Sequence, residues 1–342
     1  MQPPIETDAL VIGAGPVGLF QVFQLGLLGI QAHVVDALPF AGGQCAQLYG
    51  DKPIYDIPAI TVCTGQDLTD RLVQQASVFS PTYHWSQHVA QFVPLPDGRL
   101  STRTDSGTCF FARTVFIAAG VGAFLPKTLK IETLTPLVGH SVFYEQAAPQ
   151  PAKGSTLVIG GDSAAVQRAI ELGNPSQPVT LSHRRDQFDI NAAQQEALRE
   201  CIAAGTIQLR IGLPTEARVE NGQLCAVGLT VADGSLQWID ANVIEAYLGV
   251  SPTLAALKEW GIDLDRRCVR IDPSNCATSL PGVFAAGDVV SYPGKKKLIV
   301  CGFHEACMAA YGAQAHLWPG KTFPLQYTSS SSHLHALLGV GH

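Results

Sequence analysis

Residues 9–18 read Ala-Leu-Val-Ile-Gly-Ala-Gly-Pro-Val-Gly, an apolar run followed by a Gly-x-Gly-x-x-Gly turn. The run predicts a buried strand, and the apolar residues 19–28 after it predict a helix. Gly13 permits the tight turn, Gly15 lets backbone approach a pyrophosphate, and Gly18 lets the helix pack against the strand. The stretch therefore predicts a dinucleotide site in which the helix N-terminus holds the phosphates.

Asp36 ends the next predicted strand, at 33–36, about 20 residues beyond the first glycine of the turn. An acid there accepts hydrogen bonds from ribose hydroxyls and disfavours a 2′-phosphate, so the first ligand is expected to be FAD or NAD. Two further segments favour FAD. Asp288 follows a tight turn suited to a ribityl chain, and the loop at 40–49 carries Gln44 and Tyr49, which suit an isoalloxazine ring.

A second strand–turn–helix–strand unit begins near residue 155, and its turn at 160–165 reads Gly-Gly-Asp-Ser-Ala-Ala. The predicted cofactor contacts in this turn are Gly160, Gly161 and Ala165. After the strand at 179–182 the chain continues with a basic cluster, where the first unit has an acid; this cluster is His183, Arg184 and Arg185. Arginine binds phosphate in a bidentate manner, so the second site is predicted to take NADPH.

The second turn is irregular, because Asp162 falls where a glycine should lie against the pyrophosphate. A carboxylate about 4 Å from a phosphate charge costs roughly 1 to 4 kcal/mol. Either the side chain of Asp162 points away, or a register shift of one residue restores a usable turn. If the side chain does not point away and the register does not shift, NADPH binding is expected to be weak.

The predicted elements give an α/β fold of two nested Rossmann-like dinucleotide-binding domains with three-layer ββα character. An FAD-binding domain is expected over 1–121 and 283–342, interrupted by an NADPH-binding domain over 122–282. The other predicted elements are a helix at 67–79, strands at 85–93, 98–104 and 108–118, a helix at 191–203, a strand meander over 207–248, and a returning strand at 283–288 with a helix at 304–315.

Composition is consistent with such an enzyme. The 342 residues are 46% hydrophobic and 15% charged, and the net charge of -6 argues against binding nucleic acid or anionic membranes. No apolar run approaches the roughly 18 to 20 residues of a membrane span, and no basic segment suggests a signal peptide. The nine cysteines are scattered without metal-ligand or Cys-x-x-Cys spacing, which predicts reduced thiols, a cytoplasmic location and no metal site.

Seven segments together make the whole chain resemble the thioredoxin-reductase-like ferredoxin (flavodoxin)–NADP reductases. They are residues 11–16, 42–44, 48–49, 54–56, 183–186 and 284–288 and the tail at 327–329. In the disulfide-reducing relatives a Cys-x-x-Cys follows a pattern that matches residues 139–146, where this chain has no cysteine. The resemblance therefore implies the ferredoxin-reducing branch.

Carried over by position, the resemblance implies FAD contacts at Asp36, Gln44, Tyr49, Val89 (through its backbone), Phe124, Asp288 and Ser329. It implies that Tyr49 stacks on one face of the flavin and that Tyr327 covers the other. It also implies a homodimer in which the tail crosses toward the partner subunit.

The leading hypothesis is electron transfer from NADPH through FAD to ferredoxin or flavodoxin, with no general acid or base required. An acidic carrier needs a basic docking patch, for which Lys127, Lys130 and 295–297 are candidates. One alternative is an FAD protein of the same fold with impaired or lost NADPH binding, which is reduced by another donor or oxidises a small substrate. The other is a flavin-binding sensor without turnover.

Overall fold

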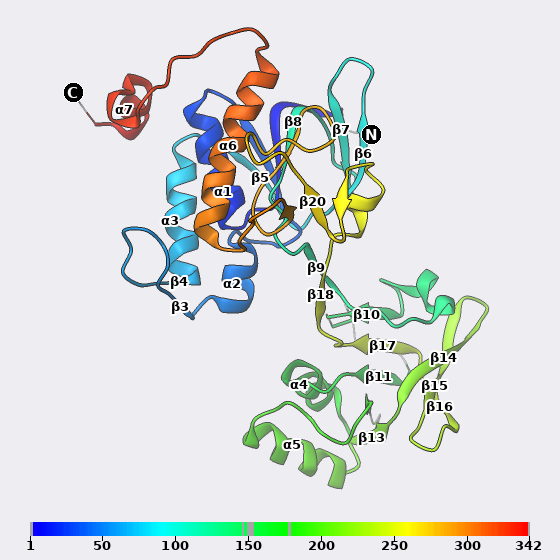
Figure 1. Ribbon diagram of the computed structural model, residues 1–342. Coiled ribbons are helices and arrows are strands. Elements are labelled where there is room, and N and C mark those ends of the chain that lie inside the picture. The colour runs from blue at the N-terminus through cyan, green and yellow to red at the C-terminus, as the bar shows by residue number, and fades with distance from the viewer. Residues whose placement is uncertain (1–2, 146, 149–153, 177–178, 341–342) are drawn as a thin grey trace. The chain divides into compact units, whose positions relative to one another are not determined.

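The computed structural model describes residues 3–145, 147–148, 154–176 and 179–340. The chain divides into two compact units (Figure 1). The first unit comprises residues 1–124 and 252–342, and the second comprises residues 125–251. The chain passes from the first unit to the second along β9 (Ala123–Pro126) and returns along β18 (Val250–Thr253).

The first unit is built on a mixed sheet in the order β5-β2-β1-β8-β7-β6, with β21 also paired to β8. The parallel strands are β1 (Ile5–Ile12), β2 (Ala32–Val35), β5 (Thr82–His84), β8 (Cys109–Ile117) and β21 (Val283–Ala285). The antiparallel edge consists of β6 (Val89–Pro94) and β7 (Leu100–Thr104). Since β21 comes from the last quarter of the chain, the C-terminal segment completes this sheet.

Three helices lie side by side against the first unit's sheet (Figure 1): α1 (Pro16–Leu27), α3 (Gly65–Ser77) and α6 (Ile299–Leu317). α3 begins with a capping box, because the Thr64 hydroxyl accepts the Asp67 N–H and the Asp67 carboxylate accepts the Thr64 N–H. The smaller elements are α2 (Gly43–Tyr49), β3 (Pro53–Ile54), β4 (Cys63–Thr64), η2 (Ala255–Lys258), β19 (Leu264–Asp265), β20 (Cys268–Arg270), β22 (Val290–Ser291), η3 (Thr328–Ser330) and α7 (Ser332–Leu338).

The second unit has a parallel sheet in the order β10-β17-β11-β12-β13. Its strands are β10 (Val142–Tyr144), β11 (Thr156–Ile159), β12 (Val179–His183), β13 (Ile207–Ile211) and β17 (Val243–Ala246), and its helices are η1 (Glu132–Leu137), α4 (Ser163–Leu172) and α5 (Ala192–Ala203). A separate antiparallel sheet is formed by β14 (Leu213–Glu220), β15 (Gln223–Thr230) and β16 (Leu236–Asp240).

The second domain boundary differs from the sequence expectation. The chain returns to the first unit at residue 252 and not at 283. Residues between these positions pack into the first unit's core, where Trp260 stacks on Phe92 with ring centroids 5.3 Å apart and Val269 is fully buried. Burial of this apolar surface therefore assigns residues 252–282 to the first unit.

Three local expectations are also corrected. The loop expected at 40–49 contains α2, which begins directly after Gly42 with its φ of 110°. α6 begins at Ile299, five residues before the expected start at 304, and no side chain caps it, so no capping signal marks the start. The meander expected over 207–248 is antiparallel only in β14–β16, because β13 and β17 pair in parallel within the other sheet.

None of the helices in the described parts of the chain combines the length and the apolar character that crossing a bilayer requires.

Candidate functional site

The three glycines of the first turn have different surroundings. A Cβ on Gly13, whose φ is +108°, would lie 2.4 Å from the Ala118 carbonyl oxygen, and one on Gly18 would lie 1.8 Å from the Gly13 carbonyl oxygen. A Cβ on Gly15 would have no neighbour closer than the Gly43 Cα, at 4.0 Å. Gly13 and Gly18 are therefore required by packing, whereas Gly15 borders open space.

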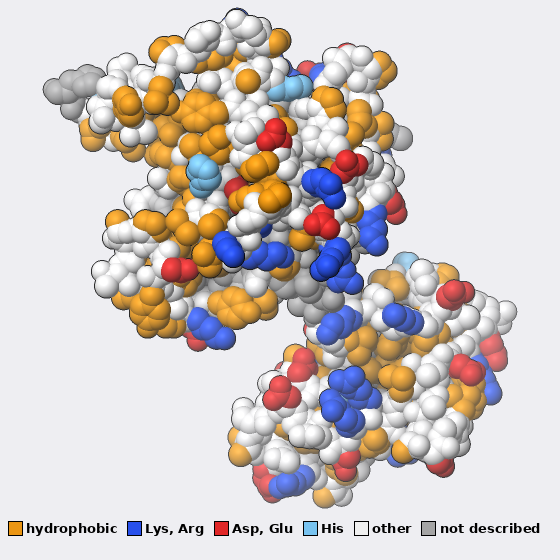
Figure 2. Space-filling view, in the orientation of Figure 1, with side chains coloured by type: hydrophobic (Ala, Val, Ile, Leu, Met, Phe, Trp, Pro, Cys, Tyr) orange, Lys and Arg blue, Asp and Glu red, His pale blue; other side chains and the backbone are white. Residues whose placement is uncertain are grey.

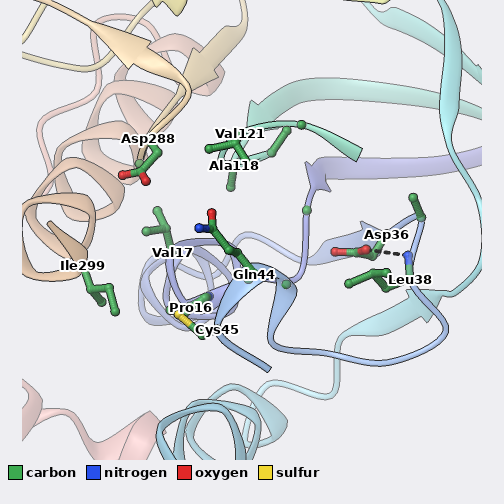
Figure 3. A pocket seen from close by; sticks show the side chains of 18 of the residues that line it. Pro16, Val17, Asp36, Leu38, Gln44, Cys45, Ala118, Val121, Asp288 and Ile299 are labelled. Carbon is green, nitrogen blue, oxygen red and sulfur yellow. Dashed lines mark hydrogen bonds between the residues drawn. The ribbon is translucent and has the colours of Figure 1, made fainter. Parts of the chain in front are cut away.

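That open space is a cavity in the first unit (Figure 3). Six of the predicted cofactor-binding residues line it: Gly13, Gly15, Asp36, Gln44, Tyr49 and Asp288. Its wall also includes the segment 118–122 after β8, and Leu298 and Ile299 at the start of α6. The carboxyl ends of β1, β2 and β8 thus open into one cavity, which is where open α/β sheets bind ligands.

Asp36 is fixed in this cavity by two backbone donors. Its Oδ2 accepts the Ala14 N–H at 2.6 Å, and its Oδ1 accepts the Leu38 N–H at 2.8 Å. Burial raises the pKa of Asp36, and the two N–H donors oppose that rise. Each oxygen keeps a free lone pair, so the carboxylate can also accept a hydrogen bond from a hydroxyl group of a ligand.

Gln44 and Tyr49 come from the two ends of α2. Figure 3 shows the Gln44 side chain between Val17 and the Ala118–Val121 segment. Tyr49 lines the cavity and is 39% exposed, with the Lys52 Nζ 4.8 Å from its ring centroid. Tyr49 thus brings an aromatic ring to the cavity wall, with the Lys52 ammonium over one of its faces.

The remaining residues predicted for the first site lie in different places. Val89 is buried and lines a smaller hollow that shares Gly13 and Asp36 with the main cavity. The side chain of Phe124 lies outside what the structure describes. Tyr327 and Ser329 are exposed and do not line the cavity within the chain.

A second cavity lies in the second unit, around the β11–α4 turn and the end of β12. Five of the predicted residues and two lysines line it: Gly160, Gly161, His183, Arg184, Arg185, Lys127 and Lys130. Figure 2 shows Lys and Arg side chains gathered on one face of this unit. Ala165 is buried, and its backbone N–H takes part in the turn. Asp162 and Asp189 also line this cavity, so its wall carries charges of both signs.

Asp162 caps α4. Its Oδ1 accepts the Ala165 N–H at 3.0 Å, so its carboxylate is bonded to the helix N-terminus and the turn keeps its register. A Cβ on Gly161 would lie 2.5 Å from the His183 ring, and one on Gly160 would lie 2.6 Å from the Tyr247 carbonyl oxygen. The backbone contact therefore requires glycine at 160, whereas a Cβ at 161 would displace the His183 ring.

Lys295 does not lie on the surface with the other candidate docking lysines, so this expectation is wrong. Its side chain is only 8% exposed, and its Nζ lies 2.5 Å from the Glu305 Oε1. Burial and pairing exclude Lys295 from contact with a partner protein. The sequence gives no sign of Glu305 as its partner, because a single acid in a long helix carries no signal of burial.

The cysteines do not form a redox pair in the structure. All nine are free thiols. Among the described residues, no three His, Cys, Asp or Glu side chains come together as metal ligands.

Comparisons with known proteins agree with this geometry. Residues 7–316 match the family described as pyridine nucleotide-disulphide oxidoreductase. The chain is 45% identical to "Ferredoxin--NADP reductase 2" of Cupriavidus metallidurans, over 98% of this chain and 92% of that protein. It is 48% identical to "Ferredoxin--NADP reductase" of Paracidovorax citrulli, over 98% of this chain and 97% of that protein.

Among solved structures, a thioredoxin reductase from Gloeobacter violaceus has the same fold. Its TM-score is 0.59 at 20% identity, with 94% of this chain and 98% of that chain covered. The chain therefore belongs to the pyridine nucleotide-disulphide oxidoreductase family, among the relatives named ferredoxin–NADP reductase.

Proposed function

We propose that this protein transfers electrons between NADPH and ferredoxin or flavodoxin through FAD, without a redox-active disulfide. The observation that carries the proposal is the contrast between the two cavities. One has an acid, Asp36, at the ribose position, and the other has Arg184 and Arg185 there. The cavity with the acid suits a cofactor that has no 2′-phosphate, and the cavity with the two arginines suits a nucleotide that carries one.

The residues of the first cavity fit FAD. Gly15 leaves the space that a pyrophosphate needs, and a Cβ would fill it. Asp36 would hold ribose hydroxyls, Asp288 the ribityl chain, and Tyr49 one face of the flavin ring. When bound, FAD supplies a redox centre that takes two electrons and releases them singly. The unit formed by residues 1–124 and 252–342 is thus the proposed FAD-binding domain.

The second unit is the proposed NADPH-binding domain. Arg184 and Arg185 are exposed side chains on the wall of its cavity, where their guanidinium groups can pair with a 2′-phosphate. Lys127 and Lys130 line the same cavity and add positive charge, which offsets Asp162 and Asp189. These two lysines therefore fit nucleotide binding better than docking of a carrier protein.

Anaerobic reduction tests the function directly. FAD-loaded protein mixed with NADPH is expected to lose its flavin absorbance rapidly, and then to reduce a cytochrome only when ferredoxin or flavodoxin is added. A flavin that stays oxidised with NADPH, but is bleached by another donor, would favour the alternative in which NADPH binding is lost. Bleaching without transfer to any carrier would favour the sensor.

The carrier is proposed to dock at Lys296 and Lys297. Both are exposed, and they directly precede Leu298 and Ile299, which line the FAD cavity. Lys and Arg side chains also gather along one edge of the first unit (Figure 2). An acidic carrier held there lies close to the flavin, as electron transfer requires.

Reversing these two charges tests the docking site. The variant K296E/K297E is expected to raise the KM for ferredoxin about tenfold at low salt, and less at high salt, because the attraction is screened. NADPH-dependent reduction of ferricyanide should stay unchanged. The matched control, K127E/K130E, is expected to change the KM for NADPH instead. A normal KM for ferredoxin in K296E/K297E would place the docking site elsewhere.

The protein is further proposed to act in the cytoplasm as a homodimer. In the C-terminal tail, Phe323, Leu325 and Tyr327 are 42%, 63% and 68% exposed. Such apolar side chains are commonly covered by a partner. A second copy of the chain would bring Tyr327 and Ser329 to the flavin of the other subunit.

A further inference from the structure

Glu305, in the middle of α6, is a buried carboxylate with three hydrogen-bond donors. Its Oε2 accepts the Gly287 N–H at 2.7 Å. Its Oε1 accepts the Tyr292 hydroxyl at 2.6 Å and the Lys295 ammonium at 2.5 Å. The side chains of Glu305 and Lys295 are 3% and 8% exposed. All three donors belong to the segment 287–295, which leads from β21 toward α6.

A buried carboxylate is tolerated only when it is paired and its lone pairs are satisfied. Lys295 neutralises Glu305, and the Tyr292 hydroxyl and the Gly287 N–H take further acceptor sites. Burial, together with the hydrogen bond to Glu305, holds the pKa of Tyr292 well above its usual range, so its hydroxyl remains a donor. The network is complete, and a complete buried network fixes the backbone to which it is bonded.

That backbone is the turn at Gly287–Asp288, which lines the FAD cavity. Gly287 has a φ of +88°, and a Cβ on it would lie 3.3 Å from the Val17 Cγ2. A Cβ on Gly302 of α6 would lie 2.4 Å from the same atom. The turn is thus packed against α1 on one side and bonded to Glu305 of α6 on the other.

We propose that Glu305 is a positioning residue for the cofactor. Its carboxylate, neutralised by Lys295, holds the Gly287 N–H and so fixes Asp288 in place for the ribityl chain before the cofactor arrives. This inference rests on the proposed FAD site. It assigns part of the affinity for FAD to a side chain that does not line the cavity.

The second unit provides a matched control for a merely stabilising role. Its buried Glu245 is 1% exposed and accepts two hydrogen bonds from Arg168, at 2.7 and 3.0 Å. Neither Arg168 nor Glu245 lines the FAD cavity. Both pairs join a buried or half-buried cation to a buried glutamate, but only the pair Lys295–Glu305 is bonded to the turn at Gly287–Asp288.

The test compares FAD binding with stability in variants that remove both charges of each pair. The variants are K295M/E305L and R168M/E245L. Both should lower the melting temperature of the apoprotein. We expect K295M/E305L to raise the dissociation constant for FAD at least tenfold, roughly the loss of one hydrogen bond to a charged group. R168M/E245L should stay within about twofold of the wild type. The measurement is a titration of the apoprotein with FAD at a temperature below its melting transition. Binding is read from the quenching of the flavin fluorescence.

A conservative variant separates the hydrogen bond from the charge. In K295M/E305Q the glutamine carbonyl can still accept the Gly287 N–H, so most of the FAD affinity should return. Should K295M/E305L fail to fold, Y292F takes its place, because it removes one donor without leaving an unpaired charge. Y292F is expected to weaken FAD binding about threefold.

Two results would overturn the inference while the proposed function stands. One is wild-type affinity for FAD in K295M/E305L, or in Y292F if the double variant does not fold. The other is an equal loss of affinity in R168M/E245L. A wild-type protein that binds no FAD would instead overturn the proposed function, and the inference with it.

Discussion

Replacing Gly15 with valine is expected to give a folded protein that holds less than about a tenth of the wild-type FAD. Gly15 has a φ of -70° and a ψ of 179°, an extended conformation that valine adopts readily. A Cβ there meets no atom of the chain closer than 4.0 Å. Valine is therefore expected to leave the fold intact, while its methyl groups fill the space that the pyrophosphate needs. A tenfold loss corresponds to about 1.4 kcal/mol, which a steric block readily exceeds.

The ratio of flavin to protein after purification, together with the melting temperature of the apoprotein, measures this effect. Gly18 provides the contrasting variant. A Cβ there would lie 1.8 Å from the Gly13 carbonyl oxygen, so G18V should lower the melting temperature as well as the FAD content. A G15V protein with a full complement of FAD would show that the pyrophosphate lies elsewhere.

The double variant R184A/R185A is expected to raise the KM for NADPH at least about 100-fold and to leave the KM for NADH unchanged. Each hydrogen bond to a charged group contributes about 1.5–3 kcal/mol, and 100-fold corresponds to about 2.7 kcal/mol. NADH lacks the 2′-phosphate, so it loses nothing when these guanidinium groups are removed. Steady-state reduction of ferricyanide with either nucleotide provides both KM values.

Arg199 is the control for this pair. It is exposed on α5 and pairs with Glu196 at 3.3 Å, away from the second cavity. R199A should leave both KM values unchanged. If R184A/R185A impaired NADH and NADPH equally, the two arginines would be acting on the fold or on a part shared by both nucleotides, and the proposed 2′-phosphate contact would be wrong.

The two nucleotide units were predictable because their signals are local. Gly13, Gly15 and Gly18 follow a buried strand and precede a helix, and the structure gives each the environment that its position in the motif requires. The same holds for the helix expected after the second turn, which the structure has as α4. Strand, turn and helix follow one another within about 20 residues, so periodicity and glycine spacing are sufficient.

What the sequence did not reveal depends on contacts between distant residues. Nothing near Trp260 indicates that it stacks on Phe92, and this long-range packing is what assigns residues 252–282 to the first unit. Lys295 stands in a run of three lysines, a pattern typical of a solvated surface. Its burial depends on Glu305, which lies ten residues later, within α6. The two residues become partners only when the chain folds.

Asp162 has a consequence for nucleotide affinity. Because its carboxylate already accepts the Ala165 N–H, a phosphate arriving at α4 meets a donor that is in use. The Asp162 carboxylate thus competes with the nucleotide phosphate for the Ala165 N–H. An N-cap bond is worth about 0.5–2 kcal/mol, so displacing it would cost roughly 2- to 30-fold in affinity. Weak retention of the nucleotide after hydride transfer favours its release, and release is the slow step in many enzymes that bind their products tightly.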